Sequence, residues 1–255
     1  MGASGSGGRL TAPALPFRDR AEAAALLAER LVEAGIEPGS LVLAIPRGGV
    51  PIGAHIARQL GLELDVIVAH KLGAPGNPEF AVGAATADGT VLIEPWARGE
   101  PGVSDAYLQE EAARQVAGAR AREERLRGGR APANPAGRTA VIVDDGIATG
   151  ATVRAAIKAA RAQGARRVVV AAPVAARESA DRLREDADDV VALATPEPFF
   201  AVGLWYRHFE AVEDREIEAL LAAAVTPGEA ERLAGNHADD RGAGRTGGPG
   251  TANDE

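Results

Sequence analysis

The chain has 255 residues, no cysteine and a formal net charge of −8, which excludes disulfides, thiolate nucleophiles and Cys-based zinc sites and disfavours broad nucleic-acid binding. With 46% hydrophobic residues, the length accommodates one α/β domain with additions. No apolar run reaches membrane-spanning length and the start lacks a signal-peptide core, so we expect a cytoplasmic protein without membrane contact.

Helix and strand patterns alternate through the middle of the chain. Residues 1–16 lack periodicity, so we expect one domain over 17–223 and a disordered tail over 227–255, which is rich in Gly, Asp and Ala. The expected helices are 18–34, about 54–60, 104–126, 153–163, 178–186 and 209–223. The expected strands are 41–45, 64–69, 80–86, 90–94, 140–143, 167–173 and 190–194, with a hairpin turn at 88–89. Such alternation predicts a parallel sheet with ligands outside the carboxyl ends of its strands.

A short apolar strand, expected over 140–143, leads into an acidic pair and then a run of small residues that opens a helix. The pair is Asp144 and Asp145, and the run contains Thr149 and Thr152. Backbone N–H groups at a helix N-terminus and nearby hydroxyls can surround a phosphate. The carboxylates lie one short loop away, where they can accept hydrogen bonds from ribose hydroxyls. This order of parts favours a sugar-phosphate site over an acidic turn that merely caps a helix.

A second loop follows the expected strand 41–45 and contains Arg47, Gly48 and Gly49 before a helical run. It again presents backbone donors toward an anion. The Arg47 guanidinium is suited to bidentate phosphate contact. Taken alone the motif fits an ordinary turn equally well, but its position at a second strand end favours a role in anion binding.

These two motifs resemble the loops that bind 5-phosphoribosyl 1-pyrophosphate (PRPP) in type I phosphoribosyltransferases. The resemblance implies an α/β fold, with a parallel-sheet core, helices on both faces, a hairpin and long-helix insertion over about 73–130, and a small C-terminal hood. It implies an enzyme that transfers the ribose 5-phosphate of PRPP to a nitrogen acceptor and releases pyrophosphate. Mg²⁺ would bind mainly through PRPP, with no direct protein metal site. The resemblance also predicts a cis peptide at Arg47–Gly48 and is compatible with a homodimer.

The expected roles follow from the positions that match the family motifs. The ribose hydroxyls would be held by Asp144 and Asp145. The 5′-phosphate would be bound by Ala148, Thr149, Gly150, Ala151 and Thr152. The departing pyrophosphate would be stabilised by Arg47, Gly48, Gly49 and Lys71. We expect the catalytic contribution to come from Asp144, Asp145, Lys71 and Arg47.

Lys71 opens a segment, 72–78, that is crowded with Gly, Pro and Asn. We expect this segment to be an irregular loop that closes over PRPP. An exposed lysine is usually a solvated surface charge. Because Lys71 follows a buried strand, we slightly favour a role in neutralising the pyrophosphate.

Two positions depart from the family pattern near the expected acceptor. Gly146 replaces an aliphatic residue, which should loosen the loop. At Ala148 purine enzymes commonly carry an Asp that handles a proton of the base, and alanine cannot do so. The acceptor is therefore expected not to be a standard purine. Aromatic residues of the 196–206 hood could stack on a heterocycle, but sealing the sheet edge or a dimer contact fits them equally well; they are Phe199, Phe200 and Trp205.

A second kind of function remains open. A regulatory protein that senses PRPP or a nucleotide on the same fold would need no acid–base residue at Ala148. The acidic charge and the lack of a DNA-binding segment argue against this interpretation. The arginines of the expected helix 104–126 alternate with glutamates, which predicts a salt-bridged solvent face and not a nucleic-acid site.

Overall fold

A computed structural model describes residues 13–224 of the chain. Its core is a five-stranded sheet in the order β2-β1-β6-β7-β8, and every neighbouring pair is parallel. The strands are β1 (Leu41–Ala44), β2 (Glu63–Val66), β6 (Thr139–Val143), β7 (Arg167–Val174) and β8 (Asp189–Ala194). The predicted α/β class with a parallel sheet is confirmed.

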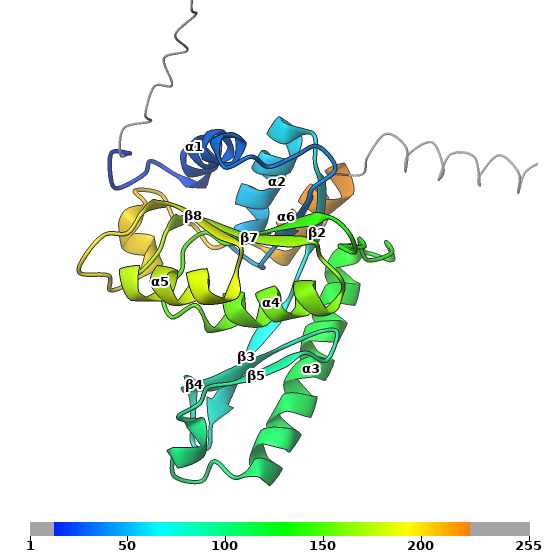
Figure 1. The fold of residues 1–255 in the computed structure, drawn as a ribbon, viewed down its shortest axis with the longest axis vertical. Helices are drawn as coiled ribbons and strands as arrows, with labels where there is room; N and C mark the ends of the chain where they lie inside the picture. Colours follow the sequence, from blue (N-terminus) through cyan, green and yellow to red (C-terminus); the bar gives the residue numbers. More distant parts are fainter. Residues whose placement is uncertain (1–12, 225–255) are drawn as a thin grey trace, which may run out of the picture. The chain divides into compact units, whose positions relative to one another are not determined.

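Helices cover both faces of this sheet (Figure 1). One face carries α1 (Arg20–Glu33), α2 (Gly49–Leu60) and α6 (Asp214–Ala223), and the other carries α4 (Ala151–Ala162) and α5 (Arg177–Asp186). Successive strand residues point to opposite faces. Val42 and Ala44 therefore join the cluster that includes α1 and α2, while Leu41 and Leu43 join the one with α4 and α5.

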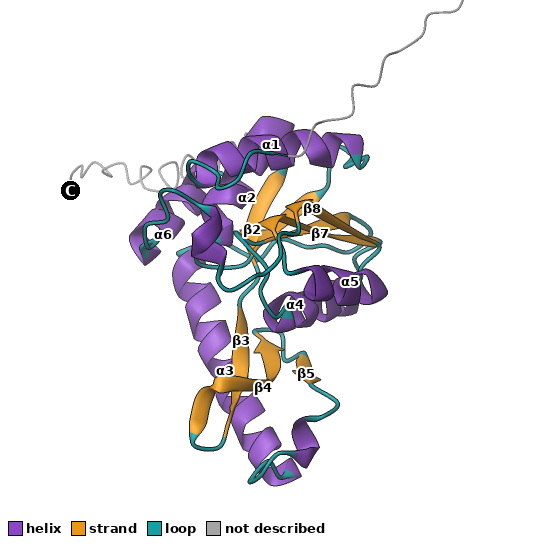
Figure 2. Ribbon diagram, turned by 90° about the vertical axis from the view of Figure 1, so that its left-hand side faces the viewer, coloured by secondary structure: helices purple, strands orange, loops and turns teal. Residues whose placement is uncertain are grey.

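The insertion is a separate three-stranded antiparallel sheet packed against a long helix (Figure 2). The strands are β3 (Ala69–Ala74), β4 (Asn77–Thr86) and β5 (Val91–Ile93); a 3₁₀ turn, η1 (Ala97–Gly99), precedes the helix α3 (Asp105–Arg127). Ser104 caps α3 by accepting a hydrogen bond from the Tyr107 N–H. The hairpin expected around 88–89 and the long helix are both confirmed.

The expectation of an irregular loop over 72–78 is wrong. β3 and β4 continue through this segment as a hairpin, in which Ala74 pairs with Asn77 across a two-residue turn. Gly76 supplies the positive φ of that turn, at 74°. A Cβ on Gly73 would lie 2.6 Å from the Pro78 Cα. The glycines therefore permit close strand pairing, and composition alone could not distinguish this from a loop.

The hood and the first of the described residues lie side by side. The Phe17 N–H donates to the Trp205 carbonyl at 2.8 Å, and the Arg207 N–H donates back to the Phe17 carbonyl at the same distance. A 3₁₀ turn, η2 (Val202–Trp205), forms the adjoining part of the hood. This pairing ties the hood to the segment that enters α1. The tail expected over 227–255, and most of 1–16, lie outside the described residues.

Candidate functional site

The acidic pair and the small-residue loop follow β6, whose five residues are all buried. The loop backbone is held from the β7 side. The Ile147 N–H donates to the Val174 carbonyl at 2.9 Å, and the Ser179 hydroxyl donates to the Ala148 carbonyl. Ala148 and Thr149 remain exposed, and Gly150, at φ 77°, is the N-cap residue before α4. The loop therefore presents its outer edge and the helix N-terminus to a ligand, as an anion site requires.

The glycine loop joins β1 to α2, one strand away. Arg47 is exposed, and Gly48 has the helical angles φ −65° and ψ −28°. The expected cis peptide at Arg47–Gly48 is wrong by one residue, because the cis bond lies at Pro46–Arg47. The Val50 N–H donates to the Arg47 carbonyl, so the Arg47–Gly48 peptide already belongs to the first turn that leads into α2.

The two loops are in direct contact. A Cβ on Gly48 would lie 1.7 Å from Oδ2 of Asp145, and one on Gly49 would lie 2.4 Å from the Val143 carbonyl oxygen. No side chain larger than hydrogen fits at either position. The glycine pair is therefore required by the packing of this loop on the acidic pair, whatever ligand its N–H groups bind.

Asp145 is not in an exposed loop. Its Oδ2 accepts hydrogen bonds from Nε and Nη2 of Arg20 at 3.0 and 2.8 Å, and the two side chains are only 13% and 14% exposed. The Tyr206 hydroxyl donates to the Asp145 carbonyl oxygen at 2.6 Å. Asp144 is less constrained, since its Oδ1 accepts only the Asp145 N–H, at 2.8 Å, among the described residues.

Burial dominates the electrostatics of the acidic pair. It raises the pKa of Asp144 well above the usual value, and the neighbouring Asp145 charge raises it further. Burial also raises the pKa of Asp145, although the Arg20 hydrogen bond opposes this change. Two adjacent carboxylates in a low-dielectric site favour a ligand that brings hydroxyl donors or a cation.

Residues 18–206 match a family model described as a phosphoribosyl transferase domain. The chain belongs to this family. Two Mycobacterium tuberculosis proteins, from strains CDC 1551 and H37Rv, each carry the name "Putative phosphoribosyl transferase" and are 44% identical over 209 residues. The matches cover 82% of this chain and 47% of each relative, so the chain spans about half their length. The crystal structure of a Thermus thermophilus protein, TT1426, is 48% identical, with a TM-score of 0.71 over 81% of this chain and 98% of that one.

In this member of the family the hood packs directly on the acidic loop. A Cβ on Gly146 would lie 2.3 Å from Cγ1 of Val202, and Gly146 is buried. The glycine at position 146 therefore makes room for the hood, and the expectation that it loosens the loop stays a prediction. Among the hood aromatics, Phe199 packs on Trp205 with ring centroids 6.1 Å apart, whereas Phe200 is 79% exposed. Phe200 is thus the most exposed aromatic of this group.

Lys71 lies on β3 of the antiparallel sheet and is exposed. The expectation that Lys71 directly follows a core strand is wrong. β2 ends at Val66, and Lys71 already belongs to the insertion. Its proposed contact with pyrophosphate stays a prediction.

The sequence alone missed Arg20 and Tyr206, which bond Asp145, and Phe209, which packs on the Arg20 guanidinium. One signal was present. Arg20 is the first residue of α1, where the helix dipole disfavours a positive charge, so an arginine there indicates a carboxylate partner elsewhere in the fold.

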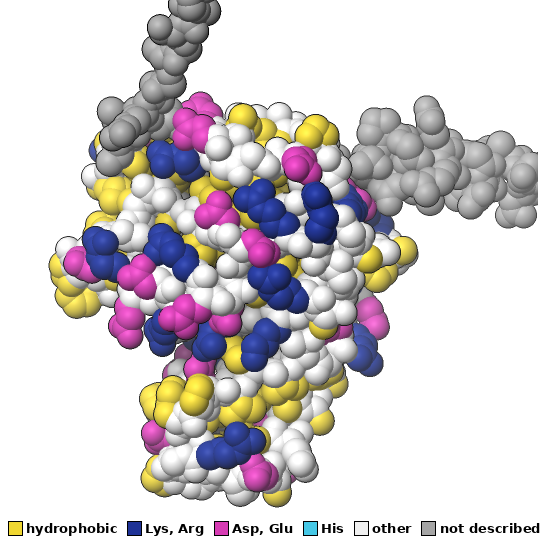
Figure 3. All heavy atoms as spheres, viewed as in Figure 1, with side chains coloured by type: hydrophobic (Ala, Val, Ile, Leu, Met, Phe, Trp, Pro, Cys, Tyr) yellow, Lys and Arg dark blue, Asp and Glu magenta, His cyan; other side chains and the backbone are white. Residues whose placement is uncertain are grey.

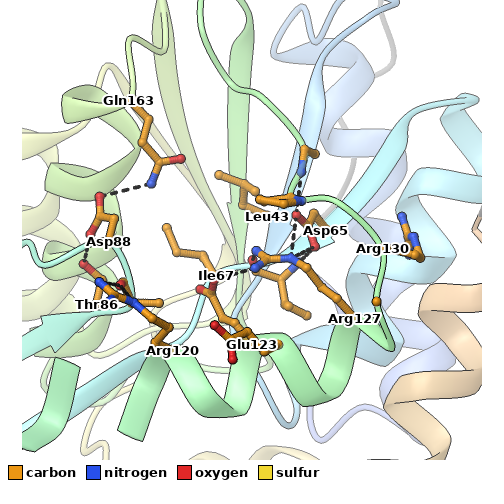
Figure 4. A pocket seen from close by; sticks show the side chains of 16 residues that line it. Leu43, Asp65, Ile67, Thr86, Asp88, Arg120, Glu123, Arg127, Arg130 and Gln163 are labelled. Atoms are coloured by element: carbon orange, nitrogen blue, oxygen red, sulfur yellow. Dashed lines mark hydrogen bonds and ion pairs between the residues drawn. The ribbon is translucent and has the colours of Figure 1, made fainter. Parts of the chain in front are cut away.

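A cavity of about 490 Å³ lies away from both loops, between β2, the β4–β5 turn and α3. Figure 4 shows two groups of polar side chains along it, one around Asp65 and Arg127 and the other around Asp88 and Gln163. Arg127 Nε donates to both Asp65 oxygens at 2.9 and 3.1 Å, and Gln163 Nε2 donates to Asp88 at 3.1 Å. These contacts are internal bonds between the core and the insertion, and no residue of either loop lines the cavity.

Four arginines of α3 form ion pairs, as expected for a salt-bridged face, whereas Arg120 donates to the Ala87 carbonyl oxygen at 3.2 Å. Arg114 contacts Glu111 and Arg127 contacts Glu123 on the helix itself, while Arg122 reaches Asp214 on α6 at 3.0 Å. On the face drawn in Figure 3, basic and acidic side chains are interspersed. No helix within residues 13–224 is long and apolar enough to cross a membrane.

Proposed function

We propose that this phosphoribosyltransferase transfers the ribose 5-phosphate of PRPP to a nitrogen acceptor and releases pyrophosphate. The observation that carries the proposal is the contact between Gly48 and Asp145. It joins a loop suited to pyrophosphate to one suited to a ribose phosphate, at the carboxyl edge of two neighbouring parallel strands. PRPP carries both groups on one sugar.

Each group of residues would bind a different part of PRPP. The 5′-phosphate lies in the loop of Ala148, Thr149, Gly150, Ala151 and Thr152, which leads into the α4 N-terminus. Asp144 and Asp145 lie at the ribose. Arg47 and the Gly48–Gly49 amides hold the pyrophosphate, and Lys71 adds a positive charge to it.

The reaction breaks the bond between C1 of ribose and the pyrophosphate oxygen and forms a bond from C1 to the acceptor nitrogen. Pyrophosphate departs with the bonding pair, and the acceptor loses its proton to solvent or to a base of the site. Carboxylates beside the ribose favour the positive charge that develops on the sugar. Positioning and charge stabilisation supply the rate, without a covalent enzyme nucleophile.

Mg²⁺ fits this site as a partner of the substrate. Mg²⁺ is commonly held by substrate phosphates with one or two carboxylates and several waters. The second Asp144 oxygen is the protein group available to such an ion, which would neutralise charge on the pyrophosphate.

The acceptor is proposed to be a nitrogen compound other than a standard purine, bound under the hood near Phe200, with Phe199 and Trp205 behind it. Ala148 is exposed at the loop, and its methyl group cannot transfer a proton. The same observation supports a second candidate, a non-catalytic protein that senses PRPP or a nucleotide.

The experiment is pyrophosphate release from PRPP and Mg²⁺ in the presence of single nucleobases and amines, with PRPP binding measured by calorimetry on the same preparation. Turnover with at least one acceptor supports the enzyme. Tight PRPP binding without turnover for any acceptor supports the sensor. Failure to bind PRPP contradicts both.

A further inference from the structure

Arg20 is the first residue of α1, where the helix dipole disfavours a positive charge, and three contacts hold its side chain in place. Its Nη1 donates to the Glu210 carbonyl at 2.9 Å. Its guanidinium carbon lies 3.9 Å from the centroid of the Phe209 ring, a cation–π contact. The Phe209 ring in turn stacks on Tyr206 at 5.0 Å. The chain following the hood therefore fixes the orientation of this arginine.

The remaining donors of Arg20 fix Asp145. Nε and Nη2 both bond the same oxygen, Oδ2, which is also the atom that a Cβ on Gly48 would meet first. The Asp145 carboxylate is thus enclosed between the guanidinium and the backbone of the glycine loop. Asp144, by contrast, keeps one carboxylate oxygen without a bonding partner among residues 13–224.

We propose that Arg20 is a positioning residue for PRPP binding, which acts by holding the Asp145 carboxylate between the two phosphate loops. Asp144 then contacts the ribose hydroxyls, while Asp145 sets the spacing of the acidic pair against Gly48. Because Arg20 also bonds the chain after the hood, a shift of the hood changes the loop that binds pyrophosphate. This inference rests on the proposed function.

The test compares PRPP binding by calorimetry, with Mg²⁺, in the wild-type chain and in Arg20→Gln, Arg20→Lys and Asp145→Asn. Arg18→Gln is the matched control, because Arg18 lies two residues away on the same segment with a side chain 62% exposed. We expect Arg20→Gln to weaken PRPP binding roughly 10- to 100-fold, as when a residue that orients a ligating group is removed. Arg20→Lys keeps the charge but cannot bond Asp145 and Glu210 at the same time. Its affinity for PRPP should therefore lie between those of the wild type and Arg20→Gln. Arg18→Gln should bind like wild type.

Two readouts separate positioning from a purely structural role. Misfolding lowers the stoichiometry of binding and leaves the dissociation constant of the folded fraction unchanged, whereas positioning raises that constant. If Arg20 acts through Asp145, then Arg20→Gln should cause no further loss in the Asp145→Asn background. Additive losses in the double variant would overturn the proposal.

The outcomes also separate this inference from the proposed function. A wild-type chain that does not bind PRPP removes the proposed function, and the role of Arg20 with it. Wild-type binding with an unchanged constant in Arg20→Gln removes the role of Arg20 alone. If Arg20→Gln does not fold, Arg20→Lys carries the test, and wild-type affinity in that variant overturns the proposal.

Discussion

Gly48 lies against the carboxylate of Asp145, so that a Cβ on this glycine would be 1.7 Å from Oδ2. A methyl group at position 48 must displace Asp145 from Arg20 or push the glycine loop off the sheet edge. We expect Gly48→Ala to abolish measurable PRPP binding and to lower the free energy of unfolding by about 1–3 kcal/mol, as overpacking does. Gly99→Ala is the control, since nothing in the described chain lies within 4 Å of its Cβ position. Normal PRPP binding by Gly48→Ala would show that the two loops do not share a ligand.

The two carboxylates of the acidic pair should respond differently to neutralisation. Asp144→Asn keeps an acceptor for the Asp145 N–H, so it should lose PRPP binding with little change in the melting temperature. Asp145→Asn leaves Arg20 without its counter-charge, so it should weaken PRPP binding while leaving it measurable, and it should lower the free energy of unfolding by about 1–3 kcal/mol. In a fully exposed loop, neither substitution would change the free energy of unfolding. Thermal melts that are identical for the two variants would argue against the Arg20 contact.

The raised pKa of Asp144 predicts a pH dependence of stability. Below the ordinary Asp pKa of 3.8 the carboxyl is protonated in both states. As the pH rises above that value the unfolded chain ionises first, so the free energy of unfolding falls until the folded pKa is passed. The melting temperature of wild type minus that of Asp144→Asn should therefore decrease over this acidic window and then level off. A difference that increases with pH would mean that the folded site favours the charged form.

The chain's two lysines provide a matched pair for testing Lys71. Lys71 on β3 and Lys158 on α4 are both exposed. If Lys71 neutralises the departing pyrophosphate, Lys71→Ala should lower PRPP turnover about tenfold or more, because the charge acts mainly in the transition state. Lys158→Ala should retain wild-type turnover. Equal rates for the two variants would make Lys71 an ordinary surface charge.

The acceptor prediction is tested at Ala148. We expect weak or no turnover of hypoxanthine and guanine by the wild-type chain, because no carboxylate stands at this position. Ala148→Asp should then raise purine turnover in the pyrophosphate-release assay if a missing proton acceptor is the limitation. An unchanged rate would assign acceptor choice to the hood around Phe200. Rapid guanine turnover by the unaltered chain would contradict the prediction.

The sequence by itself determined the parts of this site that are local in the chain. The apolar run of β6, the acidic pair and the small residues before α4 specify strand, loop and helix through backbone preferences over a dozen neighbouring positions. The same holds for β1, the glycine pair and α2. Because both loops follow parallel strands, their meeting at one sheet edge was predictable as well.

Only the tertiary structure decided which side chains the loops meet. Arg20 and Asp145 are 125 positions apart, and no periodicity relates a residue at the start of α1 to a loop after β6. The close approach of Gly146 to Val202 likewise depends on how the hood folds back. The Gly- and Pro-rich segment after Lys71 forms a hairpin because its glycines allow β3 and β4 to pair. Local composition is compatible with both a loop and a hairpin, and long-range packing determines which one forms.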